Sequence, residues 1–133
     1  MGSVTIVGLG PGPFGCLSLE TWDVIRQAPK LLLRTAVHPT VEDLRSRGVA
    51  FTSYDTFYDQ GEDFDSVYRA IADDVVEQAR VADIVFAVPG SPMVAEKTVG
   101  LIREAAVAAG LPIVVLPGMS FFEPLNLRAT NEK

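Results

Sequence analysis

Stretches of strand composition alternate with stretches of helical periodicity along this chain, and that alternation constrains the fold more than any single motif. The predicted strands are residues 4–7, 30–34, 49–54, 83–88 and 112–116. Two of them contain uninterrupted apolar runs, which are typical of strands buried on both faces of a parallel sheet. Strands that alternate with helices form right-handed βαβ units. We therefore predict an α/β fold with a mostly parallel five-stranded sheet and helices on both faces.

The segments between the strands show helical spacing and recognisable helix ends. The predicted helices are residues 19–28, 39–47, 63–80 and 92–110, and residues 55–62 are expected to form a surface loop. Ser18, His38 with Pro39, and Ser91 with Pro92 are the expected starts of three of them. In the first helix, the residues expected to face inward are Leu19, Trp22 and Ile25. In the third helix, they are Phe64, Val67, Tyr68, Ile71 and Val75.

Three predicted strands end in loops rich in glycine and proline, at residues 8–12, 89–92 and 117–120. The carboxyl ends of parallel strands lie on one edge of the sheet, and open α/β sheets bind ligands at that edge. Glycine has no Cβ, so a ligand can approach the backbone of such loops closely. The sequence therefore predicts a binding cleft where the three loops meet.

The first of these loops also fits a dinucleotide-binding pattern. Gly10, Gly12 and Gly15 match GxGxxG, so a nicotinamide-dependent oxidoreductase is one alternative. Pro11 and Pro13 lie inside the pattern, however, and proline has no N–H to offer a pyrophosphate. The loop is therefore poor in the hydrogen-bond donors that such a cofactor needs.

Charge, cysteine content and the length of apolar runs limit the binding partners and the cellular location that we expect. The chain has 133 residues, a formal net charge of −6 and no long basic run, which disfavours nucleic acid as a partner. Cys16 is the only cysteine, so no intramolecular disulfide can form, as is usual for a cytoplasmic protein. No apolar run approaches the roughly 20 residues that a membrane span requires. We expect a cytoplasmic protein without a membrane segment.

Four groups of residues, in this order, resemble the tetrapyrrole (corrin/porphyrin) methylase superfamily. They are residues 7–12, residues 33–35 with 38–39, residues 87–92 with 95–98, and residues 116–120. The chain is most similar to the branch found N-terminal to MazG-like nucleotide pyrophosphohydrolase domains. The resemblance covers about residues 3–122.

The resemblance implies a domain of two α/β lobes with S-adenosylmethionine (SAM) between them. Residues 1–122 would form the N-terminal lobe and residues 123–133 a polar tail, with the C-terminal lobe absent from this chain. The resemblance also implies a small-molecule methyl acceptor. The residues that it implies for the cofactor cleft are Gly8, Gly10, Pro11, Gly12, Val88, Pro89, Gly90, Ser91, Pro92, Met93, Met119 and Ser120.

Two positions differ from the family pattern, because Pro13 and Ser91 stand where relatives often carry aspartate. An alternative function is therefore a non-catalytic interaction or regulatory module of a MazG-like nucleotide pyrophosphohydrolase. An exposed lobe interface would also favour a homodimer through Phe14, Phe121 and Phe122.

No catalytic triad or metal-binding pattern is visible, and none is needed for methyl transfer from SAM, which requires mainly alignment of donor and acceptor. His38, the only histidine, is expected at the surface, although it could face the cleft. Ser91 is expected to act as a helix cap rather than as a catalytic group.

Overall fold

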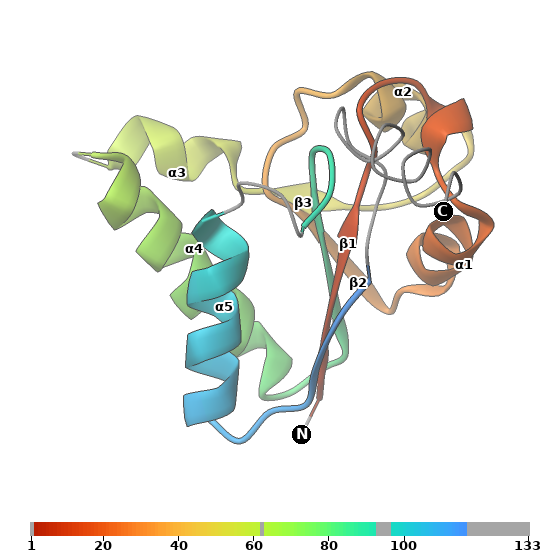
Figure 1. The fold of residues 1–133 in the computed structure, drawn as a ribbon. Helices are drawn as coiled ribbons and strands as arrows, with labels where there is room; N and C mark the ends of the chain where they lie inside the picture. The colour runs from red at the N-terminus through yellow and green to blue at the C-terminus, as the bar shows by residue number, and fades with distance from the viewer. Residues whose placement is uncertain (1, 62, 93–96, 117–133) are drawn as a thin grey trace, which may run out of the picture.

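The computed structural model describes residues 2–61, 63–92 and 97–116 (Figure 1). Its sheet contains β1 (Val4–Gly8), β2 (Lys30–Leu33), β3 (Thr52–Ser53), β4 (Ile84–Val88) and β5 (Ile113–Val115). The strand order is β3-β2-β4-β1-β5, and every neighbouring pair is parallel. The predicted five-stranded parallel α/β sheet is confirmed.

Helices cover both faces of this sheet. α1 (Leu19–Gln27) and α2 (Pro39–Ser46) lie on one face, and α4 (Phe64–Ala79) and α5 (Lys97–Ala108) lie on the other (Figure 1). Side chains alternate between the faces along each strand. In β1, for example, Ile6 belongs to the core under α4 and α5, whereas Val7 belongs to the core under α1 and α2. Each face therefore has its own apolar core.

The strand order creates a switch point between β1 and β4, which are neighbours in the sheet. The chain leaves β1 toward α1 on one face and leaves β4 toward α5 on the opposite face. Helices that diverge in this way leave a crevice outside the carboxyl ends of the two strands. The loops at residues 8–12 and 89–92 begin at this switch point.

The region after α2 differs from the prediction. The expected strand at residues 49–54 is reduced to Thr52–Ser53, because the Val49 N–H donates to Leu44 O at the end of α2. Residues 55–62 were expected to form a loop, but they contain helix α3 (Asp55–Gln60). The Phe57 N–H donates to Tyr54 O, and the two rings pack edge to face with centroids 4.9 Å apart, which closes the first turn.

The inner faces of two helices also differ from the prediction. Leu19 is 83% exposed and Phe64 is 68% exposed, so neither belongs to a core. In α1, Thr21 and Ile25 form the buried stripe instead. Ser18 caps this helix as predicted, since its Oγ accepts from the Thr21 N–H at 3.0 Å. That bond draws Thr21 inward, and Leu19 then points away from the core, about 200° around the helix from Thr21.

The start of the last helix lies partly outside the described ranges. Ser91 and Pro92 are not helical, α5 is described from Lys97 onward, and residues 93–96 lie outside the description. Residues 93–96, which would follow such a cap, are not described, so the role of Ser91 as a helix cap stays a prediction; the predicted polar tail lies outside the described residues. Within residues 2–61, 63–92 and 97–116, no helix combines the length and apolar character needed to cross a bilayer.

Candidate functional site

The loops after β1 and β4 are joined to each other by their backbones. The Leu9 N–H donates to Val88 O at 2.8 Å. One residue further on, Gly10 and Gly90 exchange both of their hydrogen bonds, at 3.1 and 3.0 Å, as an isolated antiparallel bridge. The two loops thus form one unit at the switch point of the sheet.

Three glycines make this junction possible. A Cβ at Gly8 would lie 2.1 Å from Gly90 O, so no side chain fits there without displacing the β4 loop. Gly10 and Gly90 have φ values of 79° and 67°, a backbone conformation that side chains other than glycine rarely adopt. Gly8 and Gly10 are buried, so their first role is to let the loops approach each other.

The outer surface of the junction is accessible over several of its described residues. Pro11 is exposed, and Gly12, Pro89 and Gly90 are half-buried. A Cβ built on Gly12 or Gly90 would meet no atom of the described residues within 4 Å, so the described part of the chain leaves space beside both. Val88, Ser91 and Pro92 are buried behind this surface, with Ser91 only 2% exposed.

The third loop is described only at its start. The Leu116 N–H donates to Ile6 O at 2.8 Å, which keeps the end of β5 beside β1. Met93, Met119 and Ser120, three of the predicted cofactor residues, lie outside the described residues. The first two loops meet as predicted, and the position of the third remains a prediction.

His38 and Thr40 belong to this junction, although the sequence predicted a surface position for His38. His38 Nε2 lies 2.8 Å from Gly10 O, and Thr40 Oγ1 donates to Gly12 O at 2.9 Å. Both side chains come from the start of α2, His38 as its N-cap and Thr40 in its first turn, and Thr40 is fully buried. The available signal was the His-Pro pair at the start of a helix, which marks a cap but does not reveal a second partner.

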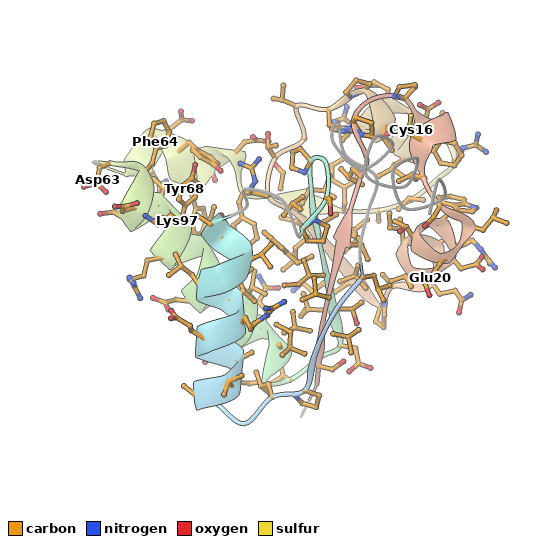
Figure 2. The ribbon with its side chains drawn as sticks, viewed as in Figure 1. Cys16, Glu20, Asp63, Phe64, Tyr68 and Lys97 are labelled. Carbon is orange, nitrogen blue, oxygen red and sulfur yellow. The ribbon has the colours of Figure 1, made fainter. Side chains whose placement is uncertain are left out.

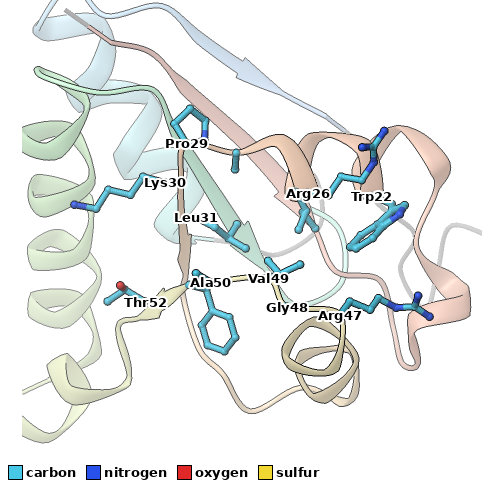
Figure 3. Close-up of a pocket in the computed structure, with 13 residues that line it drawn as sticks. Trp22, Arg26, Pro29, Lys30, Leu31, Arg47, Gly48, Val49, Ala50 and Thr52 are labelled. Atoms are coloured by element: carbon cyan, nitrogen blue, oxygen red, sulfur yellow. The ribbon is translucent and has the colours of Figure 1, made fainter.

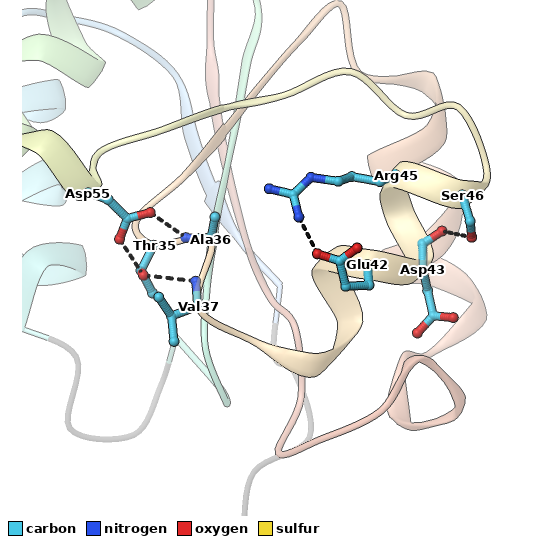
Figure 4. Close-up of polar contacts among 8 residues, drawn as sticks. All are labelled: Thr35, Ala36, Val37, Glu42, Asp43, Arg45, Ser46 and Asp55. Carbon is cyan, nitrogen blue, oxygen red and sulfur yellow. Dashed lines mark hydrogen bonds and ion pairs between the residues drawn. The ribbon is translucent and has the colours of Figure 1, made fainter.

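Asp55 orders the segment that leads from β2 to α2 (Figure 4). Its carboxylate accepts from Thr35 Oγ1 at 2.5 Å and from the Ala36 N–H at 2.8 Å. Burial disfavours the charged carboxylate, but these hydrogen bonds outweigh burial and lower the pKa of Asp55 below its usual value. The start of α2, and with it His38, is thereby held in place from the β3 side.

The geometry does not match a dinucleotide-binding turn. In such a turn the pyrophosphate sits on the N-terminus of the helix that the loop opens. Here the short 3₁₀ helix η1 (Phe14–Cys16) follows the loop, and α1 begins only at Leu19. The Gly10 N–H donates to Gly90 O and is not free to bind a phosphate.

A hollow of about 490 Å³ lies elsewhere, at the amino end of β2 (Figure 3). Trp22, Arg26 and Arg47 lie on one side of it, whereas Lys30 points to the other side. Arg47 is exposed and packs its guanidinium group over the rings of Phe14 and Trp22. Because its cationic groups do not converge and it lies at the opposite edge of the sheet, this hollow is not the candidate site.

No group of three or more His, Cys, Asp or Glu in the described part of the chain is arranged to hold a metal ion. Figure 2 shows Cys16 near the β1 loop, and Asp63, Phe64, Tyr68 and Lys97 together at the other side of the molecule. There Lys97 pairs with Asp65 and the ring of Phe64 stacks on Tyr68.

Solved structures share this fold. The crystal structure of diphthine synthase has a TM-score of 0.69 at 22% identity, over 89% of this chain and 45% of that one. The native form of uroporphyrin III C-methyl transferase from Thermus thermophilus has a TM-score of 0.64 at 23% identity, over 90% and 49%. The Thermus thermophilus transferase complexed with S-adenyl homocysteine has a TM-score of 0.62 at 22% identity, over 90% and 46%.

Sequence comparison gives the family. The protein YabN of Bacillus subtilis (strain 168) is 38% identical over 122 residues, which are 92% of this chain and 25% of YabN. The chain thus spans a quarter of that relative and less than half of the similar structures. Residues 3–130 match the family model of the tetrapyrrole (corrin/porphyrin) methylases. With this match over nearly its whole length, the chain belongs to the tetrapyrrole methylase family.

Proposed function

We propose that this chain supplies the N-terminal part of a SAM-dependent methyltransferase site. The observation that carries the proposal is the junction of the β1 and β4 loops at the switch point of the sheet, in a chain of this family. Ligands of open α/β sheets bind at such points. One similar structure was complexed with S-adenyl homocysteine, which is what SAM becomes after giving up its methyl group.

Two layers of residues would serve the cofactor. Pro11, Gly12, Pro89 and Gly90 have accessible surface, so they would contact it through glycine and proline surfaces. The buried residues behind them would hold that surface in shape; they are Gly8, Gly10, Val88, Ser91 and Pro92. Met93, Met119 and Ser120 stay in the proposal as further contact residues. The fit rests on the space that the described residues leave beside Gly12 and Gly90, which a Cβ would begin to fill.

Methyl transfer from SAM suits a site that is built from glycine and proline surfaces. SAM supplies a methyl group that its sulfonium has already activated. The protein has to align donor and acceptor and exclude water, which requires shape rather than an acid–base pair. We expect a small-molecule acceptor in the cytoplasm, since the net charge of −6 disfavours nucleic acid. Pro13 and Ser91 replace carboxylates of the family pattern, which favours an acceptor other than a porphyrinoid.

Calorimetric titration of SAM into the full-length product of the reading frame tests the proposal. Gly90→Asp should abolish measurable binding, because it puts a carboxylate into the free space at the loop junction. Gly48→Asp is a matched control: Gly48 also has a positive φ of 78° and open space at its Cβ, but it follows α2 at the opposite edge of the sheet. Equal SAM binding by both variants contradicts the proposed site.

The site also requires residues beyond those described. The chain covers only 45% to 49% of the similar structures, so we propose that a second lobe completes the cofactor cleft. The 133-residue chain alone should then bind SAM weakly and associate as a homodimer, through the region near Phe121 and Phe122 with Phe14. Sedimentation at micromolar concentration measures this. A monomer that binds SAM at low micromolar affinity contradicts this part of the proposal.

A non-catalytic role is the second candidate. The chain spans 25% of YabN, which leaves room for further domains in such a protein, and two carboxylates of the family pattern are missing here. The lobe would then be an interaction or regulatory module beside a MazG-like nucleotide pyrophosphohydrolase domain. Two results together favour it: no heat on SAM titration, and altered nucleoside triphosphate pyrophosphohydrolysis by the full-length product when this lobe is deleted.

A further inference from the structure

The start of α2 holds the β1 loop through two carbonyl groups that belong to that loop. His38 Nε2 contacts Gly10 O, and Thr40 Oγ1 donates to Gly12 O. These carbonyls flank Pro11, the exposed residue at the tip of the loop. Both ends of the short segment around Pro11 are therefore fastened to the start of the same helix.

The hydrogen bonds of His38 determine which ring nitrogen carries the proton. The backbone N–H of Thr40 points to Nδ1 at 3.1 Å. A backbone N–H can only donate, so Nδ1 must offer its lone pair and the hydrogen of the neutral ring must sit on Nε2. Nε2–H then donates to Gly10 O, and both nitrogens are used at once.

Histidine is an unusual residue for the N-cap of a helix. Asn, Asp and Ser cap helices well through short side chains. Those side chains end near the helix, whereas the imidazole of His38 caps α2 with one nitrogen and reaches Gly10, 28 positions away in sequence, with the other. The second bond is what histidine adds to a cap.

The carbonyl that His38 contacts is shared. Gly10 O also accepts from the Gly90 N–H at 3.0 Å, and a carbonyl oxygen has lone pairs for two donors. One oxygen atom thus joins the β1 loop, the β4 loop and α2. We infer that His38 is a positioning residue that fixes the β1 loop against the β4 loop. His38 thereby orients the surface of Pro11 and Gly12. Its effect on SAM affinity rests on the proposed function, whereas its effect on the two loops does not.

Two substitutions separate this role from helix capping. His38→Asn keeps a good cap but is too short to reach Gly10 O. His38→Gln can carry an N–H to about the place of Nε2 but caps poorly. In the full-length product, we expect SAM to bind about threefold to tenfold more weakly to His38→Asn, the effect of one hydrogen bond, and the melting temperature to fall by no more than about 6 °C. His38→Gln should bind SAM within about twofold of the native affinity and melt lower.

Amide hydrogen exchange gives a readout that does not depend on SAM. Exchange at Gly10 and Gly90 should be several-fold faster in His38→Asn than in the native protein, and close to native in His38→Gln. The ¹⁵N spectrum of the only histidine should show the hydrogen on Nε2. Native exchange in His38→Asn, equal acceleration in both variants, or a hydrogen on Nδ1 overturns the inference. A native protein that binds no SAM, but shows the expected exchange pattern, contradicts the proposed function and supports the role of His38.

Discussion

Replacing Gly8 by alanine should separate the two loops that form the candidate site. The new Cβ would lie 2.1 Å from Gly90 O and 2.9 Å from Pro92 Cδ. Neither atom belongs to a flexible side chain, because one is backbone and the other is part of a proline ring. The β4 loop must therefore move, and the pair of hydrogen bonds between Gly10 and Gly90 must lengthen or break.

The size of the effect follows from these contacts. Two backbone hydrogen bonds contribute about 0.5–1.5 kcal/mol each, and overpacking of a tight interior costs about 1–3 kcal/mol. Both figures describe the same displacement, so we expect a loss of about 2–3 kcal/mol in the free energy of unfolding. At about 4 °C for each kcal/mol, the melting temperature should fall by about 8–12 °C.

Gly12→Ala is the matched control for this substitution. Its Cβ would meet no atom of the described residues within 4 Å, and Gly12 is not among the glycines with positive φ, so we expect a change below about 0.5 kcal/mol. Thermal and urea unfolding followed by circular dichroism measure both variants. Equal stability of Gly8→Ala and Gly12→Ala would refute the reasoning, because the close approach of the loops would then not constrain residue 8.

Three further changes test the surrounding structure. Tyr54→Phe removes the 2.6 Å hydrogen bond to Asp74 Oδ2, and urea unfolding should show a loss of about 1.5–3 kcal/mol. Asp55 has a lowered pKa in the folded protein, so its stabilising effect is present at neutral pH and disappears as the pH falls below about 4. Asp55→Asn should therefore lose less stability than the native protein between pH 7 and pH 3. Thr98→Val removes a buried hydroxyl that has no hydrogen-bond partner among the described residues, so the free energy of unfolding should rise by about 1 kcal/mol and the melting temperature with it; a fall would show that the hydroxyl is satisfied.

The sequence predicted the sheet well because its signals are local. Apolar runs such as residues 84–88 and the glycines that follow them identify buried strands and the edge where they end. Secondary structure at the edge was harder to predict, because β3 and α3 depend on contacts with distant elements. Thr52 and Ser53 form a strand only by pairing with β2, and residues 55–60 form a helix beside Tyr54, which packs against Phe86 of β4.

The candidate site was likewise predictable from the sequence only in part. Its glycines could be found from the sequence, since their spacing is visible within a few residues. The role of His38 could not, because its partner Gly10 is 28 positions away and no local pattern specifies which carbonyl an imidazole will meet. The requirement for glycine at residue 8 could not be predicted either, since it depends on the close approach of Gly90 in the loop after β4.

The pairing of β1 with β4 also determines when the site can form during synthesis. Val4 pairs with Ile84, so the two loops come from strands that are 80 positions apart in the chain. At about 5–20 residues per second, the ribosome makes the second strand about 4–16 s after the first. During that interval the apolar residues of β1 lack their central neighbour, whereas each helix can form within microseconds of emerging. The glycine-rich loops therefore become a binding surface only after β4 has been inserted into the middle of the sheet.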